Sequence, residues 1–207
     1  MRQLIPTAVL VTALLCLHAA PALADAPAAQ LRASIDEVIK SLEDPGLRSE
    51  ASGDKRRAAI RRAASNIFDF GEAARRSLGR HWSSLPDTDR QEFVALFTDL
   101  LERAYVGRIE QYSGERIVYA GDLVDGDAAT VKTRLVTRKG TEIPIDYRML
   151  RRADRWLVYD VLVEGLSLVA NYRSQFNKII ETSSYQDLVK RMKARGEDFH
   201  APTAKRS

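Results

Sequence analysis

The chain has 207 residues, of which 45% are apolar and 29% charged, an ordinary balance for a globular protein of one domain, with or without an appendage. It carries 32 basic and 28 acidic side chains but only one cysteine. This composition excludes a fold held together by disulfides and a metal cluster built on cysteine ligands.

The first 24 residues predict a secretory signal peptide that is cleaved after Ala24. Arg2 supplies a positive charge, a nearly continuous apolar run follows from Leu4 to Leu17, and Ala22-Leu23-Ala24 has the pattern of a cleavage site. The apolar run is about 14 residues long, too short to span a bilayer comfortably. Because Cys16 lies within this segment, the exported chain keeps no cysteine and has no thiolate chemistry.

Loss of Arg2 leaves 31 basic against 28 acidic side chains, a net charge of +3. An exported protein with this balance is not expected to meet nucleic acid, but it can meet anionic lipid headgroups or an acidic surface of a partner. For any single basic cluster, an ordinary solvated surface is an equally good interpretation.

Three helical segments are predicted before the strands. The first runs from Ala28 to Leu42, and the second from Gly53 to Leu78, with an interruption expected within Asn66 to Gly71. The third starts within Leu85 to Gln91 and continues to about Tyr112. The second segment is very basic at its start: Lys55, Arg56, Arg57, Arg61 and Arg62.

After Gly114 the hydrophobic period changes to two, which predicts an antiparallel meander of about four strands. The expected strands are Arg116 to Ala120, Ala129 to Arg138, Glu142 to Leu150 and Arg155 to Glu164. Two helices, Ser167 to Ile180 and Tyr185 to Ala194, and a polar tail at 196–207 follow. This order is that of an α+β fold, placed in residues 25–195 as a single domain. Alternation in the last strand groups Leu157, Tyr159, Val161 and Val163 on one face.

The sequence around Ser167, Gly165-Leu166-Ser167-Leu168-Val169, resembles a nucleophile elbow only in part. That motif needs a second glycine where Val169 stands, and the only histidine downstream is His200, in the tail. A hydrolase using Ser167 is one hypothesis, and a helix N-cap is the favoured one.

Acidic residues offer two further candidate sites. Asp146, Asp160 and Glu164 could act as acid and base on adjacent strands, but ion pairs with Arg148 and Arg134 are the favoured interpretation. A second acidic group is interpreted as turn-forming, with a weak cation site as the alternative: Asp122, Asp125 and Asp127. No catalytic residue, metal or cofactor is therefore expected.

Several motifs together resemble the MlaC family, also called toluene-tolerance proteins, which are periplasmic phospholipid carriers of Gram-negative bacteria. The resemblance covers roughly residues 30 to 195, and it rests most on the run W-x-x-Y-D-V-x-x-E-G-x-S-L-V-x-x-Y-R-x-Q-F. The motifs that carry it, in chain order, are Leu78-Gly79-Arg80-His81-Trp82, Phe93, Phe97, Tyr105, Asp146-Tyr147-Arg148, Trp156-Leu157-Val158-Tyr159-Asp160-Val161, Val163-Glu164-Gly165-Leu166-Ser167-Leu168-Val169 and Tyr172-Arg173-Ser174-Gln175-Phe176.

The resemblance implies a curved, cone-like sheet packed with helices, similar to nuclear-transport-factor-like folds, around an apolar cavity for acyl chains. It implies a periplasmic lipid carrier, expected to be a monomer, that serves ABC-transporter-linked maintenance of outer-membrane lipid asymmetry. Its implied partners are a phospholipid, an outer-membrane lipoprotein–porin complex and an inner-membrane ABC transporter complex. A subgroup associated with hopanoid lipids is the alternative, and no catalytic residue is implied.

On this resemblance, twelve residues are candidates for lining the cavity, although by pattern alone each could be ordinary core. Arg173 is the candidate for contact with the phosphate of the headgroup, and an ion pair with Glu164 is its rival role. The candidate lining residues are Phe93, Phe97, Tyr105, Tyr147, Tyr159, Val161, Val163, Leu166, Leu168, Val169, Tyr172 and Phe176.

Overall fold

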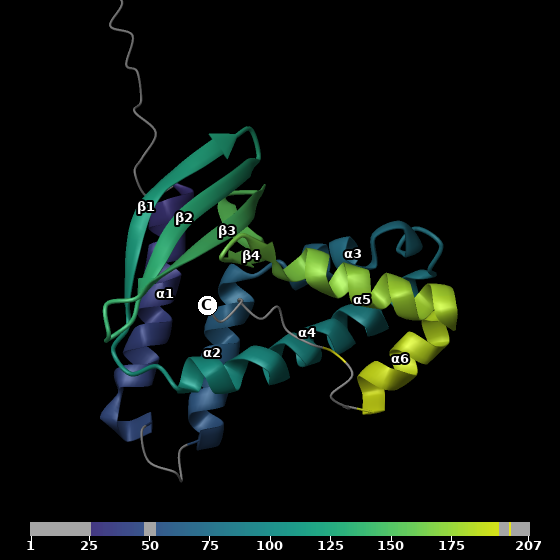
Figure 1. Ribbon diagram of the computed structural model, residues 1–207, viewed down its shortest axis with the longest axis horizontal. Coiled ribbons are helices and arrows are strands. Elements are labelled where there is room, and N and C mark those ends of the chain that lie inside the picture. Colours follow the sequence, from purple (N-terminus) through teal and green to yellow (C-terminus); the bar gives the residue numbers. More distant parts are fainter. Residues whose placement is uncertain (1–25, 48–52, 195–198, 200–207) are drawn as a thin grey trace, which may run out of the picture.

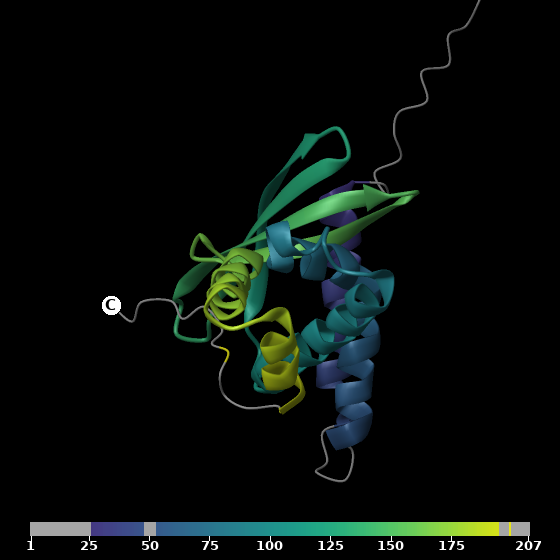
Figure 2. The ribbon, with the colours of Figure 1, turned by 90° about the vertical axis from the view of Figure 1, so that its right-hand side faces the viewer.

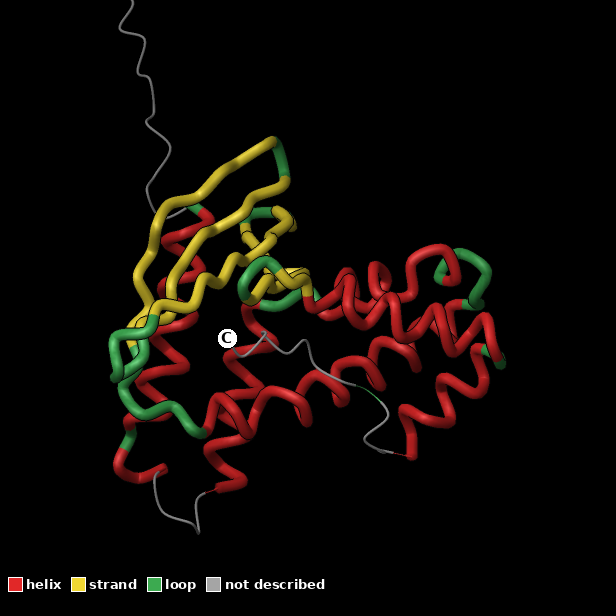
Figure 3. Tube along the Cα trace, viewed as in Figure 1, coloured by secondary structure: helices red, strands yellow, loops and turns green. Residues whose placement is uncertain are grey.

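The computed structural model describes residues 26–47, 53–194 and 199, so the predicted signal peptide and nearly all of the polar tail lie outside the described residues. Helices precede an antiparallel sheet and two helices follow it, which confirms the α+β class (Figure 1; Figure 3). The elements are α1 (Pro27–Glu43), η2 (Pro45–Leu47), α2 (Gly53–Ile67), α3 (Phe70–Leu78), η4 (Gly79–His81), α4 (Asp87–Glu110), β1 (Arg116–Asp125), β2 (Ala128–Val136), β3 (Glu142–Arg152), β4 (Arg155–Val163), β5 (Leu166–Ser167), α5 (Leu168–Thr182) and α6 (Tyr185–Ala194).

The sheet has the order β1-β2-β3-β4-β5, and every neighbouring pair is antiparallel. It has one short strand more than predicted, β5, and β1 continues five residues beyond its predicted end at Ala120. The register of β1 against β2 shifts between Tyr119 and Gly121, and Gly121 has a φ of 120°, which only glycine adopts readily. A bulge therefore lets the strand continue where the alternation of the sequence breaks.

A second bulge changes the face to which Tyr159 points. Arg148 pairs with Asp160 but the next residue, Met149, pairs with Val158, so Tyr159 is the extra residue in β4. The extra residue interrupts the alternation. The expectation that Leu157 and Tyr159 share a face with Val161 is therefore wrong, since Val158 and not Leu157 lies on the face of Val161.

The first hydrophobic core joins α3, α4, α5 and α6 around four aromatic rings. Phe93 and Phe97 of α4 and Tyr172 and Phe176 of α5 are all 0% exposed. Phe97 meets Tyr172 edge to face with 5.5 Å between ring centroids, and Phe93 meets Phe176 in the same way at 5.6 Å. Edge-to-face pairs add about 0.5–1.5 kcal/mol each to the stabilisation that burial of the rings provides.

The second core lies between the sheet and the first two helices. Leu31 of α1 and Ile67 of α2 are buried against Val131, Met149 and Val158 of the sheet. Figure 2 shows α1 and α2 side by side, and the two helices contact each other as well as the strands. We call the sheet surface that faces α1 and α2 the inner face.

The basic start of α2 is largely paired within the chain. Arg56 and Arg57 both approach the carboxylate of Glu110, at 3.5 and 3.2 Å, and Arg61 pairs with Glu102 at 2.8 Å. Both glutamates belong to α4, which in Figure 1 crosses beneath the sheet from α2 towards α6. These pairs hold α2 against α4, so three of the five basic side chains of this segment have partners in the fold.

Phe97→Ala is expected to lower the free energy of unfolding by about 3–5 kcal/mol, because it leaves a cavity among rings that have no exposed surface. Urea unfolding followed by circular dichroism measures the change. Leu123→Ala is the control, since Leu123 is 64% exposed and should cost less than about 0.5 kcal/mol. Equal losses in the two variants would contradict the assignment of Phe97 to the core.

Candidate functional site

The inner face is only half covered by helices. Along β2, Ala129, Val131 and Thr133 are buried, but Leu135 near the end of the strand is only partly buried. The register pairs Leu135 with Ile143 of β3, so the same end of the sheet is open on both strands. The opposite end carries the second core.

The partly exposed end of the inner face is lined by aliphatic side chains and one phenol. Ile145 pairs with Val163, and Tyr147 pairs with Val161, which places all four on the same face. All four are intermediate in exposure, whereas Met149, further along β3, is fully buried. An apolar surface that no helix seals is the part of this fold that can accept an apolar ligand.

Tyr119 adds a phenol to the inner face, and two further phenols, Tyr105 and Tyr172, belong to α4 and α5. The hydroxyls of Tyr105, Tyr119 and Tyr172 are buried without a hydrogen-bond partner among the described residues. Burial raises the pKa of Tyr119 to about 12, and it also raises the pKa of Tyr105, which has Tyr172 as a neighbour. A buried hydroxyl without a partner costs about 1–3 kcal/mol. Tyr119 on the inner face can therefore serve a ligand that brings a polar atom, whereas Tyr172 has no exposed surface.

The candidate lining residues fall into separate places. Most of the aromatic ones belong to the helical core, where Phe93, Phe97, Tyr172 and Phe176 pack on one another without exposed surface. Val169 is buried in the same core, and Leu168 packs at its edge. Their contact with a lipid stays a prediction, and their evident role is to hold α4 and α5 together.

The remaining candidates lie on the inner face, at the surface or in a polar pocket. Tyr147, Val161 and Val163 are on the inner face, while Leu166 is 46% exposed. Tyr159 lies elsewhere, beneath the guanidinium of Arg76, whose central carbon is 4.1 Å from the ring centroid.

The inner face includes further residues that were not among the candidates predicted from the sequence. Tyr119 and Ile117 of β1, Leu135 of β2, and Ile143 and Ile145 of β3 face inward by register. In β3 the signal was present, because isoleucines alternate there with polar residues or proline before Tyr147.

A polar pocket of about 340 Å³ lies away from the inner face, between α3, β4 and the start of α5. Four arginines, one carboxylate and one phenol contribute to it, so it differs sharply from the inner face. We call it the arginine pocket, and its lining residues are Arg75, Arg76, Gly79, Arg148, Tyr159, Asp160, Ser167, Val169, Ala170 and Arg173.

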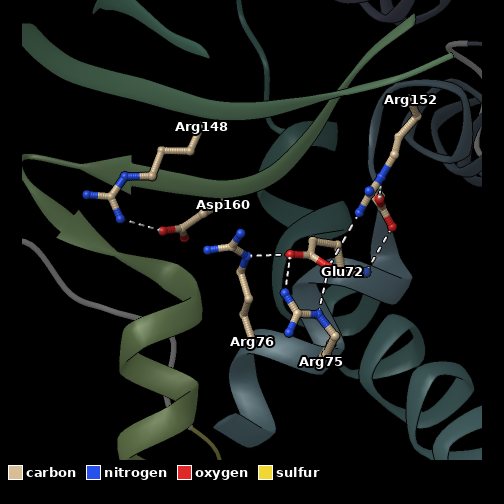
Figure 4. Close-up of polar contacts among 7 residues, drawn as sticks. Glu72, Arg75, Arg76, Arg148, Arg152 and Asp160 are labelled. Carbon is tan, nitrogen blue, oxygen red and sulfur yellow. Dashed lines mark hydrogen bonds and ion pairs between the residues drawn. The ribbon is translucent and has the colours of Figure 1, made fainter. Parts of the chain in front are cut away.

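The buried carboxylate of Glu72 holds two of these arginines in place (Figure 4). Arg75 donates to Glu72 through Nη2 at 2.6 Å and Nε at 2.8 Å, and Arg76 donates through Nε at 2.7 Å. Arg152 of β3 reaches the same carboxylate at 3.4 Å. The hydrogen bond from Arg75, assisted by Arg76 and opposed by burial, lowers the pKa of Glu72 from 4.5 to about 2.

Arg173 is exposed in the arginine pocket and has no ion pair among the described residues. The rival role considered for it, an ion pair with Glu164, is therefore not formed. Its side chain lies close to Gly79, where an added Cβ would stand only 3.2 Å from Cδ of Arg173. Gly79 also has a φ of 56°, so both its conformation and its lack of a side chain suit this position.

Ser167 is the N-cap of α5, as the sequence predicted. Its Oγ accepts a hydrogen bond from the amide of Ala170 at 2.9 Å and donates to Oδ2 of Asp160 at 2.7 Å. Asp160 is 4% exposed, and it also accepts from the amide of Val169 at 3.0 Å and from Arg148 at 3.3 Å. The ion pair with Arg148 confirms the favoured interpretation of Asp160.

No histidine stands beside Ser167 in the part of the chain that the structure describes, and the carboxylate it contacts, Asp160, is already paired with Arg148. His81 bonds Asn177 at 3.0 Å, and Asn177 lies ten residues further along α5, about 15 Å by helical rise. Among the described residues no three histidine, cysteine or acidic side chains come together as a metal site. No helix among them is long and apolar enough to cross a membrane.

Ser167→Ala is expected to lower the free energy of unfolding by about 1–2 kcal/mol, because it removes the helix cap and one hydrogen bond to a buried carboxylate. Ser174→Ala on the same helix is the control, since its exposed hydroxyl bonds only a carbonyl within the helix. Urea unfolding of both variants decides the matter. A Ser167→Ala variant as stable as the parent would rule out the capping role.

Glu72→Gln is expected to lower the free energy of unfolding at pH 7 by about 1–2 kcal/mol. The shift of its pKa from 4.5 to about 2 alone corresponds to about 3 kcal/mol, which solvent around the half-exposed arginines reduces. The contribution is complete above pH 4.5 and disappears as the pH falls through 2, so the two proteins should converge in stability across that range.

Thermal unfolding between pH 2 and 7 tests this dependence. Glu142→Gln is the matched control, because its pair with Arg134 is exposed on both sides. A constant gap between Glu72→Gln and the parent down to pH 2 would show that the carboxylate charge is not the cause.

Comparisons with known proteins agree with this architecture. The family model described as MlaC protein matches residues 32–194. The intermembrane phospholipid transport system binding protein MlaC of Haemophilus influenzae is 21% identical over 141 residues, and the match spans 66% of each chain, just under two thirds of that protein. A phospholipid-binding protein from Ralstonia solanacearum, solved in complex with a phospholipid, has the same fold, with a TM-score of 0.73, 24% identity, and coverage of 82% of this chain and 96% of that one. Since the family model matches most of the sequence, the chain belongs to the MlaC family.

Proposed function

We propose that this protein is a periplasmic carrier that holds the acyl chains of a phospholipid against its inner face and moves the lipid between membrane complexes. The observation that carries the proposal is the half-covered inner face, where Ile145, Tyr147, Val161 and Val163 form an apolar surface that remains partly exposed. The Haemophilus influenzae relative is named for phospholipid transport, and the Ralstonia solanacearum structure holds a phospholipid. Both support the same cargo here.

The physical requirement for such a carrier is a dry surface for the lipid tails. Each methylene exposed to water costs about 0.8 kcal/mol, so a chain of about 16 carbons costs on the order of 12 kcal/mol to expose. The protein must offset nearly all of this cost, yet not exceed it by much, or release would fail. Such a carrier is nearly neutral against the bilayer, and the direction of transport comes from its partners.

The proposed partners are an outer-membrane lipoprotein–porin complex and an inner-membrane ABC transporter complex. Membership of the MlaC family supports them, as does the intermembrane transport system in the name of the Haemophilus influenzae relative. The predicted signal peptide at residues 1–24 is consistent with a periplasmic location. Residues 25–195 form the lipid-binding domain in this proposal.

Individual contacts follow from the accessible surface. We expect Tyr147, Val161 and Val163 to touch the acyl chains directly, with Tyr105 offering its buried hydroxyl to a polar atom of the lipid. Phe97 and Tyr172 would serve as the rigid support behind that surface, because they have no exposed area of their own.

Native mass spectrometry of the mature chain, purified without detergent, is expected to show a mass excess of one or two phospholipids that disappears on denaturation. Val161→Glu should abolish the excess, because a carboxylate on the inner face cannot share that surface with acyl chains. Lipid analysis of the same sample identifies the cargo, including a hopanoid.

Val118→Glu is the control for this experiment. Val118 is 41% exposed and pairs with the exposed Arg134, so the same substitution there lies outside the inner face and should leave lipid binding intact. Circular dichroism checks that both variants are folded. A folded Val161→Glu protein that still carries lipid, or a parent that stays bare after incubation with liposomes, would disprove the proposed site.

A further inference from the structure

Three arginines from three different elements converge on the arginine pocket. Arg76 comes from α3, Arg148 from β3 and Arg173 from α5, and all three line the same hollow. Figure 4 shows the guanidiniums of Arg76 and Arg148 on either side of Asp160. Convergence from distant parts of the sequence means that the fold itself, and no local basic run, concentrates positive charge here.

Two of these three side chains are held in position by polar contacts. Arg76 bonds Glu72 at 2.7 Å and lies over the ring of Tyr159, and Arg148 bonds Asp160 at 3.3 Å. The third, Arg173, has no polar partner among the described residues, and its stem lies close to Gly79, where an added Cβ would stand 3.2 Å from Cδ. Side chains that are already ordered lose less conformational entropy when a ligand binds.

All three guanidiniums have donors that the protein does not use. Arg76 donates to Glu72 only through Nε, and Arg148 donates to Asp160 only through Nη1. In the described part of the chain, Arg173 donates no hydrogen bond and forms no ion pair. The pocket therefore offers donors from at least three directions to an acceptor that enters it.

The charge balance of the pocket favours an anion. Four guanidiniums, those of Arg75, Arg76, Arg148 and Arg173, stand against the carboxylates of Glu72 and Asp160, which leaves an excess of two positive charges. Both carboxylates already accept several hydrogen bonds from the protein, so neither competes strongly for the unused donors.

We propose that the arginine pocket is a binding site for a phosphate group, separate from the apolar inner face. A carboxylate has two coplanar oxygens and is satisfied by one planar guanidinium fork, whereas the tetrahedral oxygens of phosphate accept from several directions, as this pocket donates. The bulge at Tyr159 turns Tyr159 and Asp160 towards the pocket and leaves Val161 on the inner face. The proposal does not rest on the carrier function, although the phosphate of a phospholipid is one source of the ligand.

The test uses the mature chain labelled with ¹⁵N and titrated with inorganic phosphate, with the arginine Nε–Hε signals as the readout. Signals from Arg76, Arg148 and Arg173 are expected to shift together and to saturate. Arg173→Gln should weaken binding about tenfold, because it removes one charge-assisted contact. Arg173 is the residue of choice, since it has no partner in the described fold to lose.

Arg134→Gln is the matched control. It removes the same charge from an exposed position on β2, paired only with Glu142, and should leave phosphate binding unchanged. Gly79→Ala provides an independent variant, because it leaves every arginine in the sequence but crowds Arg173. Circular dichroism verifies the fold of each.

Two further arms distinguish the source of the phosphate. If it belongs to the carried lipid, Arg173→Gln will shift the ³¹P resonance of the co-purified phospholipid. If it belongs to a membrane surface, the parent will bind vesicles containing phosphatidylglycerol more tightly than vesicles of phosphatidylcholine alone, and Arg173→Gln will lose the difference. A response to inorganic phosphate alone, with neither lipid effect, identifies a soluble phosphate ligand.

The proposal is overturned if phosphate and both lipid arms give no effect, or if the Arg173→Gln and Arg134→Gln proteins respond alike. Acetate that binds as tightly as phosphate would also overturn it, because the pocket would then select charge and not tetrahedral geometry. A parent that carries no lipid but still binds phosphate would disprove the carrier function while leaving this site in place.

Discussion

The buried carboxylate of Asp160 joins the sheet to α5. It accepts hydrogen bonds from the hydroxyl of Ser167 and the amide of Val169, and it pairs with Arg148 on the neighbouring strand. A buried charge is costly unless it is paired and hydrogen-bonded, so the end of β4 and the start of α5 cannot separate without a large penalty. The direction in which α5 leaves the sheet is thereby fixed.

The direction of α5 determines which environment each of its side chains enters. Tyr172 and Arg173 are adjacent in sequence, yet a helix turns about 100° per residue, so the first enters the aromatic core and the second enters the arginine pocket. One helix thus contributes to an apolar core on one side and to a charged pocket on another. The bulge in β4 does the same on the sheet, where Tyr159 and Val161 serve different environments.

Much of this architecture could be predicted from the sequence, because it depends on hydrophobic period. The helical spacing of the segment from Phe93 to Tyr105 and the alternation after Gly114 gave the elements and the α+β class. The bulges could not be predicted, since a single extra residue reverses the face of a side chain without changing composition. Tyr159 was therefore assigned to the wrong face.

The burial of individual side chains and the partners of the charged residues could not be predicted from the sequence either, for a different reason. Phe97 and Val161 are both apolar and fit their elements equally well, but only the packing of distant helices decides which one is sealed. The basic start of α2 gave no hint of its partners, Glu102 and Glu110, which lie more than 40 residues away on α4. Likewise, Arg76, Arg148 and Arg173 share one pocket only because the fold brings α3, β3 and α5 together there.

The separation of the two hydrophobic cores has a consequence for the emptied protein. The four rings of Phe93, Phe97, Tyr172 and Phe176 complete one another and need nothing from the inner face of the sheet. The helical core is thus complete without any ligand on the inner face. Loss of a ligand from the inner face would therefore leave the packing of these four rings unchanged.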